Sequence, residues 1–255
     1  MKSSVLYEKS GGVGIISLNR PDVNNAINST MIAEFAGICA DISIDNEIKA
    51  VIITGAGSGT FCTGIDPDEL DTMGGKLEKG RLSLAAPVAA LSCPTIAAIN
   101  GDAFDQGLEL ALACDLRIAV KETSLGVRHI GQGYIPWDGA TQRLPRVMGM
   151  TRAMEMVLTG KELSAEEAFE TGLVTKIVAA DELIPFVKDM AQTMTTKSPL
   201  ALSFAKEAIN NGMDLTLEQG LRLEGDLYFL LHTTEDRTEG IKAFLEKRKP
   251  EFKGK

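Results

Sequence analysis

The sequence predicts an α/β protein that ends in an all-helical region. Up to about residue 180, short apolar runs rich in β-branched residues alternate with helical patterns, which indicates strands separated by helices. Such alternation is typical of βαβ units with right-handed crossovers. From about Asp181 onward every apolar pattern has helical spacing, and no run suggests a strand.

Each expected element rests on a local pattern. Apolar, β-branched runs predict strands, at residues 13–18, 50–54, 95–99, 116–119 and 174–178. Met31, Phe35 and Ile42 fall at helical spacing, and we expect Ser29-Thr30 to cap their helix. Four stripes at helical spacing predict the C-terminal helices, at residues 184–191, 200–209, 221–231 and 241–245.

Composition excludes several classes of protein. The 255 residues include 26 basic and 35 acidic side chains, which gives a net charge of −9 at pH 7. The 44% hydrophobic and 24% charged residues are ordinary globular values. Nucleic-acid binding needs a basic surface, so the charge argues against it. Four widely spaced cysteines and two histidines argue against a metal site such as zinc and predict reduced, mostly buried thiols.

Two features bear on location. Residues 1–12 contain no apolar signal segment, and we expect a cytoplasmic protein. Residues 82–101 carry no charge, but Pro87 and Pro94 interrupt them. We therefore expect a helix end followed by a buried strand there, and no membrane span.

Two glycine-marked turns follow predicted strands, at residues 57–66 and 100–109. Glycine at a strand end lets backbone N–H groups point outward. Neither turn has the spacing of a dinucleotide-binding loop or a P-loop. Taken alone, both turns are also compatible with ordinary chain reversals.

Together with their surroundings, these turns resemble the crotonase superfamily, the enoyl-CoA hydratase/isomerase family. The matching motifs are SLNRPDVNNAIN at 17–28, FCTGID at 61–66, AAING at 97–101, GLELALACD at 107–115, TQRL at 141–144, GLV at 172–174 and EDRTEGIKAFLEKRKP at 235–250. The resemblance implies a crotonase (ClpP-like) spiral of ββα units over residues 1–195. It also implies a C-terminal helical trimerisation region over residues 196–255, and a homotrimer or dimer of trimers.

The resemblance further implies an acyl-CoA substrate whose thioester carbonyl is polarised by the backbone N–H groups of Ile65 and Gln106. Reaction at the α- or β-carbon builds negative charge on that oxygen, and each fixed donor is typically worth ~3 kcal/mol. Residues 104–107 contain one glycine where family members often have three. We therefore expect a bulkier and more polar pocket floor.

Three residues are candidates for acid/base catalysis. Glu109 matches one of two family glutamates that hold and activate water, although a carboxylate in a first helical turn can also simply stabilise the helix dipole. His129 occupies the position of the second glutamate, with a structural role as the alternative. Asp138 could act as an acid or could cap the helix that starts at Gly139.

The motif around Asp138 also bears on the acyl group. Trp137 is the only tryptophan, and its flat face and the nearby Tyr134 are compatible with a ring. In its missing second glutamate and its Trp-Asp-Gly turn, the chain resembles the cyclic dienoyl-CoA hydratases of anaerobic aromatic breakdown.

The CoA moiety has weaker candidates. Asp66 matches an acidic family residue, and Asn24 lies near the usual adenine loop. Lys247 and Lys253 of the basic tail could meet the nucleotide phosphates, within one chain or across a subunit interface, or could form an ordinary solvated helix end. Basic residues in the range 76–81 form another candidate phosphate patch, with surface charge as the alternative.

The leading functional hypothesis is hydration of an α,β-unsaturated acyl-CoA, with no metal and no redox cofactor. Double-bond isomerisation needs only one carboxylate and is an alternative. Hydrolysis of a C–C or thioester bond, led by Asp138, is another. A catalytically silent CoA-thioester-binding protein is favoured by the substituted second glutamate and opposed by the retained Glu109.

Overall fold

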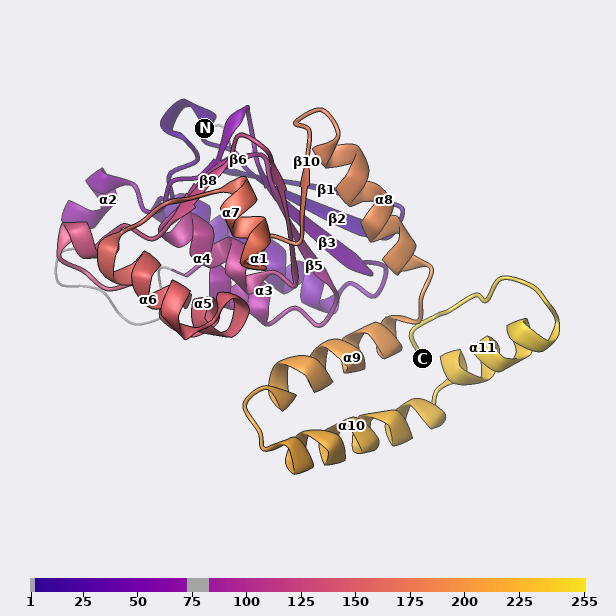
Figure 1. The fold of residues 1–255 in the computed structure, drawn as a ribbon. Coiled ribbons are helices and arrows are strands. Elements are labelled where there is room, and N and C mark those ends of the chain that lie inside the picture. Colours follow the sequence, from indigo (N-terminus) through magenta and orange to yellow (C-terminus); the bar gives the residue numbers. More distant parts are fainter. Residues whose placement is uncertain (1–2, 73–82) are drawn as a thin grey trace.

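The structure is a computed structural model that describes residues 3–72 and 83–255. Within these residues the strands form two sheets (Figure 1). The larger sheet has the spatial order β1 (Val5–Ser10), β2 (Val13–Leu18), β3 (Ala50–Gly55), β5 (Thr95–Ile99), β7 (Leu116–Val120) and β10 (Lys176–Val178). The smaller sheet has the order β4 (Gly59–Cys62), β6 (Gly101–Phe104), β8 (Ser124–Gly126) and β9 (Leu163–Ser164).

Consecutive strands pass from one sheet to the other. β3, β5 and β7 pair in parallel in the larger sheet, and the strands that follow them, β4, β6 and β8, pair in parallel in the smaller one. The helix α2 (Pro67–Thr72) follows β4, and α4 (Gln106–Ala113) follows β6. The chain therefore repeats a ββα unit, which confirms the predicted α/β class.

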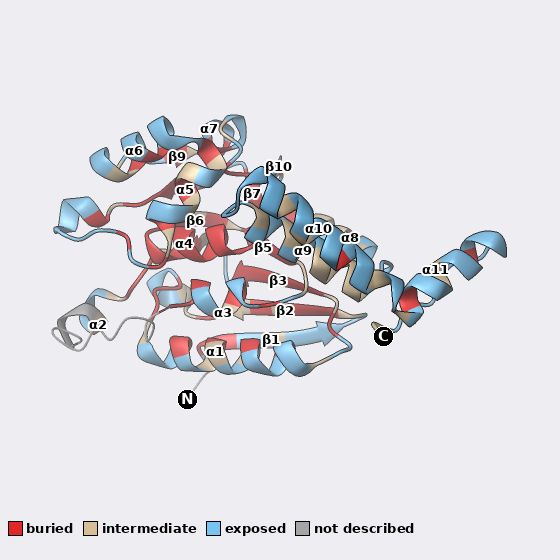
Figure 2. Ribbon diagram, turned by 90° about the horizontal axis from the view of Figure 1, so that it is seen from below, coloured by how far each residue is buried: buried red, intermediate tan, exposed pale blue. Residues whose placement is uncertain are grey.

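Helices cover both faces of the larger sheet. The helix α8 (Leu183–Thr195) packs on one face through Leu183, Val187 and Ala191, which meet apolar residues of β3, β5 and β7. On the other face lie α1 (Ser29–Ile44), α3 (Ala85–Ala89) and α4. Every residue of β3 is buried, which explains its continuous apolar pattern. All eight residues of α4 are buried as well, at the centre of the core (Figure 2).

Shorter helices connect these elements, and the three α-helices among them, which follow β8, add apolar residues to the core. They are the 3-10 helices η1 (Pro21–Val23) and η2 (His129–Gln132) and the α-helices α5 (Ala140–Met148), α6 (Met150–Thr159) and α7 (Ala165–Glu170). A capping box at Ser164 and Glu167 begins α7.

The C-terminal region consists of α9 (Pro199–Gly212), α10 (Leu217–His232) and α11 (Glu235–Leu245). These helices extend away from the sheets (Figure 1). The helix α9 has no buried residue, and α10 buries only Leu227. A cavity of about 810 Å³ lies between α9 and the ends of α4 and α5. The predicted division after residue 195 falls at the end of α8.

The structure corrects several details of the expected elements. The cap of α1 is Asn28, whose side chain accepts the Met31 N–H, because Ser29 is already the first helical residue. The last strand of the larger sheet begins at Lys176, since residues 174 and 175 belong to the preceding turn. The strand β1 and the short strands β4, β6, β8 and β9 were not predicted.

Two further expectations concern thiols and membranes. The described structure has four free cysteines, with Cys39, Cys62 and Cys114 buried and Cys93 half-buried. Burial raises the pKa of Cys62 to about 12, so this thiol stays protonated near neutral pH. No helix within the described ranges is both long and apolar enough to span a membrane.

Candidate active site

The candidate site lies where the turn after β4 meets the start of α4. This close approach depends on Gly107, because a Cβ there would lie only 2.2 Å from the Cys62 carbonyl oxygen. Ile65 is tied in from the other side by a parallel β-bridge to Ile27. The two predicted oxyanion donors, Ile65 and Gln106, therefore come together, as expected.

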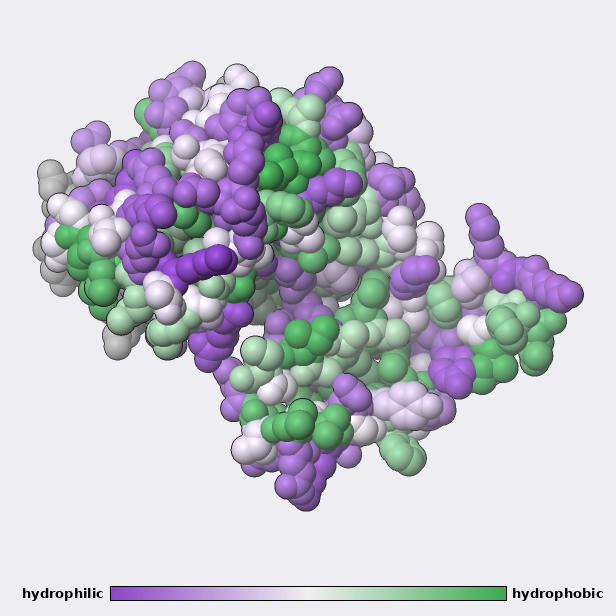
Figure 3. Space-filling view, in the orientation of Figure 1, coloured by the Kyte–Doolittle hydropathy of each residue, from purple (hydrophilic) through white to green (hydrophobic). Residues whose placement is uncertain are grey.

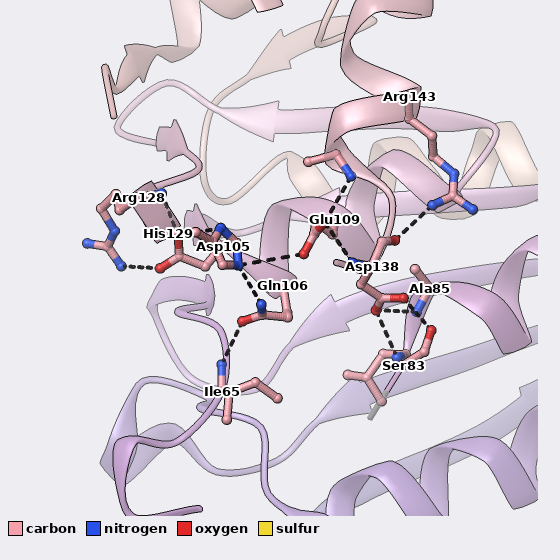
Figure 4. A network of polar contacts seen from close by, with 12 residues as sticks. Ile65, Ser83, Ala85, Asp105, Gln106, Glu109, Arg128, His129, Asp138 and Arg143 are labelled. Carbon is pink, nitrogen blue, oxygen red and sulfur yellow. Dashed lines mark hydrogen bonds and ion pairs between the residues drawn. The ribbon is translucent and has the colours of Figure 1, made fainter. Parts of the chain in front are cut away.

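The side chain of Gln106 engages one of these two backbone donors. Its Oε1 accepts the Ile65 N–H at 3.1 Å (Figure 4), so that donor is engaged, contrary to the expectation of a donor free for substrate. Sequence matching places a backbone and leaves the side-chain direction open. The Gln106 N–H is at the first residue of α4, where a helix offers no internal acceptor. Gln106 is 2% exposed.

Glu109 is fully buried one turn into α4. Its Oε1 accepts the backbone N–H groups of Asp138 at 2.9 Å and Ala140 at 2.8 Å. Its Oε2 has no hydrogen-bond partner among the described residues. Burial raises the pKa of Glu109 to about 7, because the charged form loses its hydration. A fixed carboxyl with one open oxygen and a pKa near neutrality suits acid/base work.

His129 lies beside this open oxygen, with its Nε2 3.8 Å from Glu109 Oε2. The same Nε2 lies 2.5 Å from Nε2 of Gln106. An amide NH₂ can only donate, so His129 Nε2 accepts and the imidazole proton sits on Nδ1. Nδ1 faces Oδ1 of Asp105 at 3.4 Å. Burial lowers the pKa of His129, which favours the neutral ring.

Asp138 serves a different helix from the one expected. Its carboxylate accepts the N–H groups of Leu84 at 3.2 Å and Ala85 at 3.1 Å and the hydroxyl of Ser83. It therefore caps the start of α3, while Gly139 caps α5 without a side chain. Burial raises the pKa of Asp138. Figure 4 shows its carboxylate turned toward Ser83 and away from the open oxygen of Glu109.

Sequence reasoning missed Asp105 and Arg128. Asp105 precedes α4 with φ 53° and ψ −123°, a conformation that favours glycine. Its carboxylate compensates by accepting the Arg128 backbone N–H at 2.6 Å and by pairing with the guanidinium at 3.3 Å. The available signal was the acidic residue directly before a predicted helix, in a glycine-marked turn.

The predicted acyl-pocket residues flank the histidine. The Trp137 ring meets His129 edge-on at a centroid distance of 5.2 Å, and Tyr134 meets Trp137 in the same way at 6.3 Å. Trp137 is 37% exposed and Tyr134 is 43% exposed. Trp137 therefore lies next to His129, and both rings reach the surface.

The predicted CoA residues divide into two places. Asn24 accepts the Thr63 hydroxyl through its backbone carbonyl, and Asp66 pairs with Arg20 at 2.9 Å, so both lie beside the oxyanion turn. Lys247 and Lys253 follow α11, which lies at the opposite end of the molecule from α2 in Figures 1 and 2. The structure therefore does not bring these lysines to the site within one chain.

The remaining candidate features are a basic patch and a metal site. The basic patch in the range 76–81 lies outside the described residues. Among the described residues, no group of three or more His, Cys, Asp or Glu side chains could hold a metal ion.

Comparison with known proteins shows which family the chain resembles. Residues 8–255 match the family described as enoyl-CoA hydratase/isomerase. The short-chain-enoyl-CoA hydratase of Clostridium acetobutylicum and the crotonyl-CoA hydratase of Syntrophomonas wolfei are each 36% identical over 254 residues, covering 98% of this chain and 97% of theirs. The crystal structure of an enoyl-CoA hydratase from Bacillus anthracis superposes with a TM-score of 0.94 at 38% identity, covering 99% of this chain and 100% of that one.

These matches confirm the crotonase resemblance, the fold class and the prediction of an enoyl-CoA hydratase-like enzyme at the level of the family. The chain belongs to the enoyl-CoA hydratase/isomerase family of the crotonase superfamily.

Proposed function

We propose that this protein hydrates an α,β-unsaturated acyl-CoA thioester, with Glu109 and His129 as the working pair. The observation that carries the proposal is the open Oε2 of Glu109, 3.8 Å from His129 Nε2. A single water can contact both atoms at this separation once the Gln106 amide, which lies 2.5 Å from the same Nε2, has moved aside. Glu109 and His129 thereby take the places of the two glutamates that family hydratases use.

The proposed reaction assigns one role to each group. The ionised Glu109 takes a proton from the water, and the water oxygen bonds to the β-carbon of the substrate. The electron pair moves toward the thioester oxygen, where the N–H groups of Ile65 and Gln106 stabilise it. The proton held by Glu109 then passes to the α-carbon, so that one water is added in total.

His129 orients the water in this scheme. Its Nε2 is an acceptor, because the proton is on Nδ1, and it can take the second O–H of the water. The lowered pKa of His129 supports this role, since the ring remains neutral and keeps its lone pair near pH 7. Neither step needs an electron carrier, and the backbone N–H groups polarise the carbonyl, so we propose catalysis without a metal or redox cofactor.

The geometry ranks the alternatives. Isomerisation is the second candidate reaction, because Glu109 alone can move a proton between two carbons. Hydrolysis led by Asp138 is disfavoured, because both oxygens of that carboxylate already accept hydrogen bonds. A silent CoA-binding protein is disfavoured by the open oxygen and raised pKa of Glu109, which a purely structural carboxyl would not need.

Two observations bear on the acyl group of the substrate. Close relatives are named for short-chain and crotonyl substrates, which favours a short linear chain. The partly exposed aromatic ring of Trp137 next to His129 favours an acyl group with a flat ring, as in a cyclic dienoyl-CoA. We propose a short enoyl-CoA first and a cyclic dienoyl-CoA as the second candidate.

A mass-spectrometric panel tests the proposal. The protein would meet short linear enoyl-CoAs and cyclic enoyl- and dienoyl-CoAs, beside Glu109→Gln and a surface control, Glu166→Gln. Gain of one water with the wild type and the control, but not with Glu109→Gln, supports a hydratase. A shifted double bond at constant mass would mean isomerisation, and free CoA would mean hydrolysis.

We further propose that the protein assembles through its C-terminal helices, as a homotrimer or a dimer of trimers in the cytoplasm. Figure 3 shows apolar residues gathered on this region. Exposed apolar side chains on α9, α10 and α11 include Ile209, Leu221, Tyr228, Phe229, Ile241 and Phe244. A surface of this kind marks an interface. Sedimentation of the wild type and of Phe229→Asp tests this assembly. A wild type that sediments as a monomer would overturn it.

A further inference from the structure

The side-chain amide of Gln106 joins the two halves of the candidate site. Its Oε1 accepts the Ile65 N–H at 3.1 Å, and its Nε2 lies 2.5 Å from His129 Nε2. Both contacts are buried, and Figure 4 shows them as one continuous chain from Ile65 to His129. The amide therefore occupies the Ile65 N–H, to which the proposed function assigns the thioester oxygen. It also occupies the Nε2 lone pair of His129, to which the proposed function assigns the water.

An amide is a good substitute for the substrate at this point. Its carbonyl oxygen is an acceptor like that of a thioester, and it already lies within hydrogen-bond distance of the Ile65 N–H. Space for it comes from Gly64, where a Cβ would lie 3.0 Å from Gln106 Oε1 and 2.9 Å from the Asp105 Cβ. A thioester oxygen at the same donor would collide with this amide.

We propose that the Gln106 side chain is an internal occupant of the oxyanion site, which an acyl-CoA must displace before it can react. This inference rests on the proposed function for the identity of the ligand. In the free protein the amide satisfies the buried N–H of Ile65 and holds His129 in its Nδ1-protonated form. When the amide swings out, the thioester oxygen takes the Ile65 N–H, and Nε2 of His129 becomes free for water in the same movement.

The cost of displacement should appear as weakened binding. The ligand replaces the bond to Ile65, while the bond between Gln106 and His129 is lost, and one such neutral bond corresponds to roughly a fivefold change in affinity. Gln106→Ala removes the occupant and leaves both backbone N–H groups in place. We therefore expect this variant to bind a thioester about fivefold more tightly than the wild type does.

Calorimetric titration with two unreactive ligands tests the proposal. The ligands are butyryl-CoA and S-butyl-CoA, a thioether that lacks the carbonyl. The control variant is Gln192→Ala, an exposed glutamine on α8 whose side chain bonds only Thr195 among the described residues. Gln106→Ala should tighten butyryl-CoA binding and leave S-butyl-CoA binding unchanged, while Gln192→Ala changes neither. Equal effects on both ligands, or weaker thioester binding, would overturn the proposal.

Amide hydrogen exchange separates this proposal from the proposed function. The Ile65 amide should be protected in the free wild type and should exchange faster in free Gln106→Ala. If the protein binds neither CoA ligand, the proposed function fails, and this exchange difference still decides whether Gln106 occupies the donor. An Ile65 amide that exchanges equally fast in both proteins would overturn the internal occupant.

Discussion

Oε2 of Glu109 lies 3.8 Å from Nε2 of His129, and it has no hydrogen-bond partner among the described residues. Neighbouring groups position this pair, and the Gln106 amide lies 2.5 Å from the same His129 nitrogen in the free protein. The N–H groups of Asp138 and Ala140 fix the other oxygen of Glu109. Asp105 faces the far nitrogen of His129. The arrangement leaves one carboxylate oxygen and one imidazole nitrogen directed at the same small space.

Glu109→Gln should lose activity and gain stability at high pH. Activity should fall by roughly 10²–10⁴ if the carboxylate is the acid/base group. The pKa of Glu109 is raised from 4.5 to about 7 by burial, so the folded protein binds more protons than the unfolded chain between these values. Stability from this group is thus complete below pH 4.5 and is lost as the pH rises through 7.

Urea unfolding of both proteins at pH 5 and pH 9 measures that effect. Glu109→Gln should exceed the wild type by about 3 kcal/mol at pH 9 and should match it near pH 5. A stability difference that does not change with pH would contradict a raised pKa at Glu109.

Asp105→Asn should lower the pKa of His129 further. Burial already lowers that pKa, while the Asp105 carboxylate raises it, so removal of the charge leaves burial less opposed. Titration of both histidines by NMR measures the change, with the exposed His232 as an internal reference. An unchanged His129 titration would show that the carboxylate does not act on the ring.

Asp138 can be tested with two substitutions. Asp138→Asn keeps an oxygen for the N–H groups of Leu84 and Ala85 and an amide for Ser83, so most activity and stability should remain. Asp138→Ala should cost about 2–4 kcal/mol, because it removes a helix cap and leaves buried donors without partners. Chemical unfolding measures the stability of the two variants, and a turnover assay measures their activity. A large loss of turnover in folded Asp138→Asn would return Asp138 to a catalytic role.

Chelation should leave turnover unchanged. The proposed scheme polarises the thioester with backbone N–H groups and moves protons with Glu109 alone, so no step uses a metal. Dialysis of the active protein against EDTA, followed by assay with and without added Mg²⁺ or Zn²⁺, measures this. Activity that disappears on dialysis and returns with one ion would contradict the scheme.

Much of the fold could be predicted from local patterns. The run at 50–54 is apolar on both faces because β3 is buried between α8 and the helices on the other face, and its sequence reflects that directly. The strands β4 and β6 were hidden in glycine-marked turns. They are four residues long, and they exist through pairing of Gly59 with Gly101, which are distant in sequence.

At the site, the sequence predicted which positions meet but not where their side chains point. The motif match named Ile65, Gln106 and Glu109, and the structure brings these positions together at the start of α4. Asp138 caps a helix 53 residues earlier in the sequence. The side-chain amide of Gln106 contacts Ile65, which is 41 residues earlier. Such contacts depend on the assembled fold, so a local pattern cannot reveal them.

Incorporation of labelled oxygen tests the central claim most directly. The wild type and Glu109→Gln would turn over a short linear enoyl-CoA in water enriched in heavy oxygen, and the products would be analysed by fragmentation mass spectrometry. We predict one labelled hydroxyl on the β-carbon with the wild type and almost none with Glu109→Gln. Label at the β-carbon with both proteins would remove Glu109 from the chemistry, and no label with the wild type, on linear and cyclic substrates alike, would contradict hydration itself.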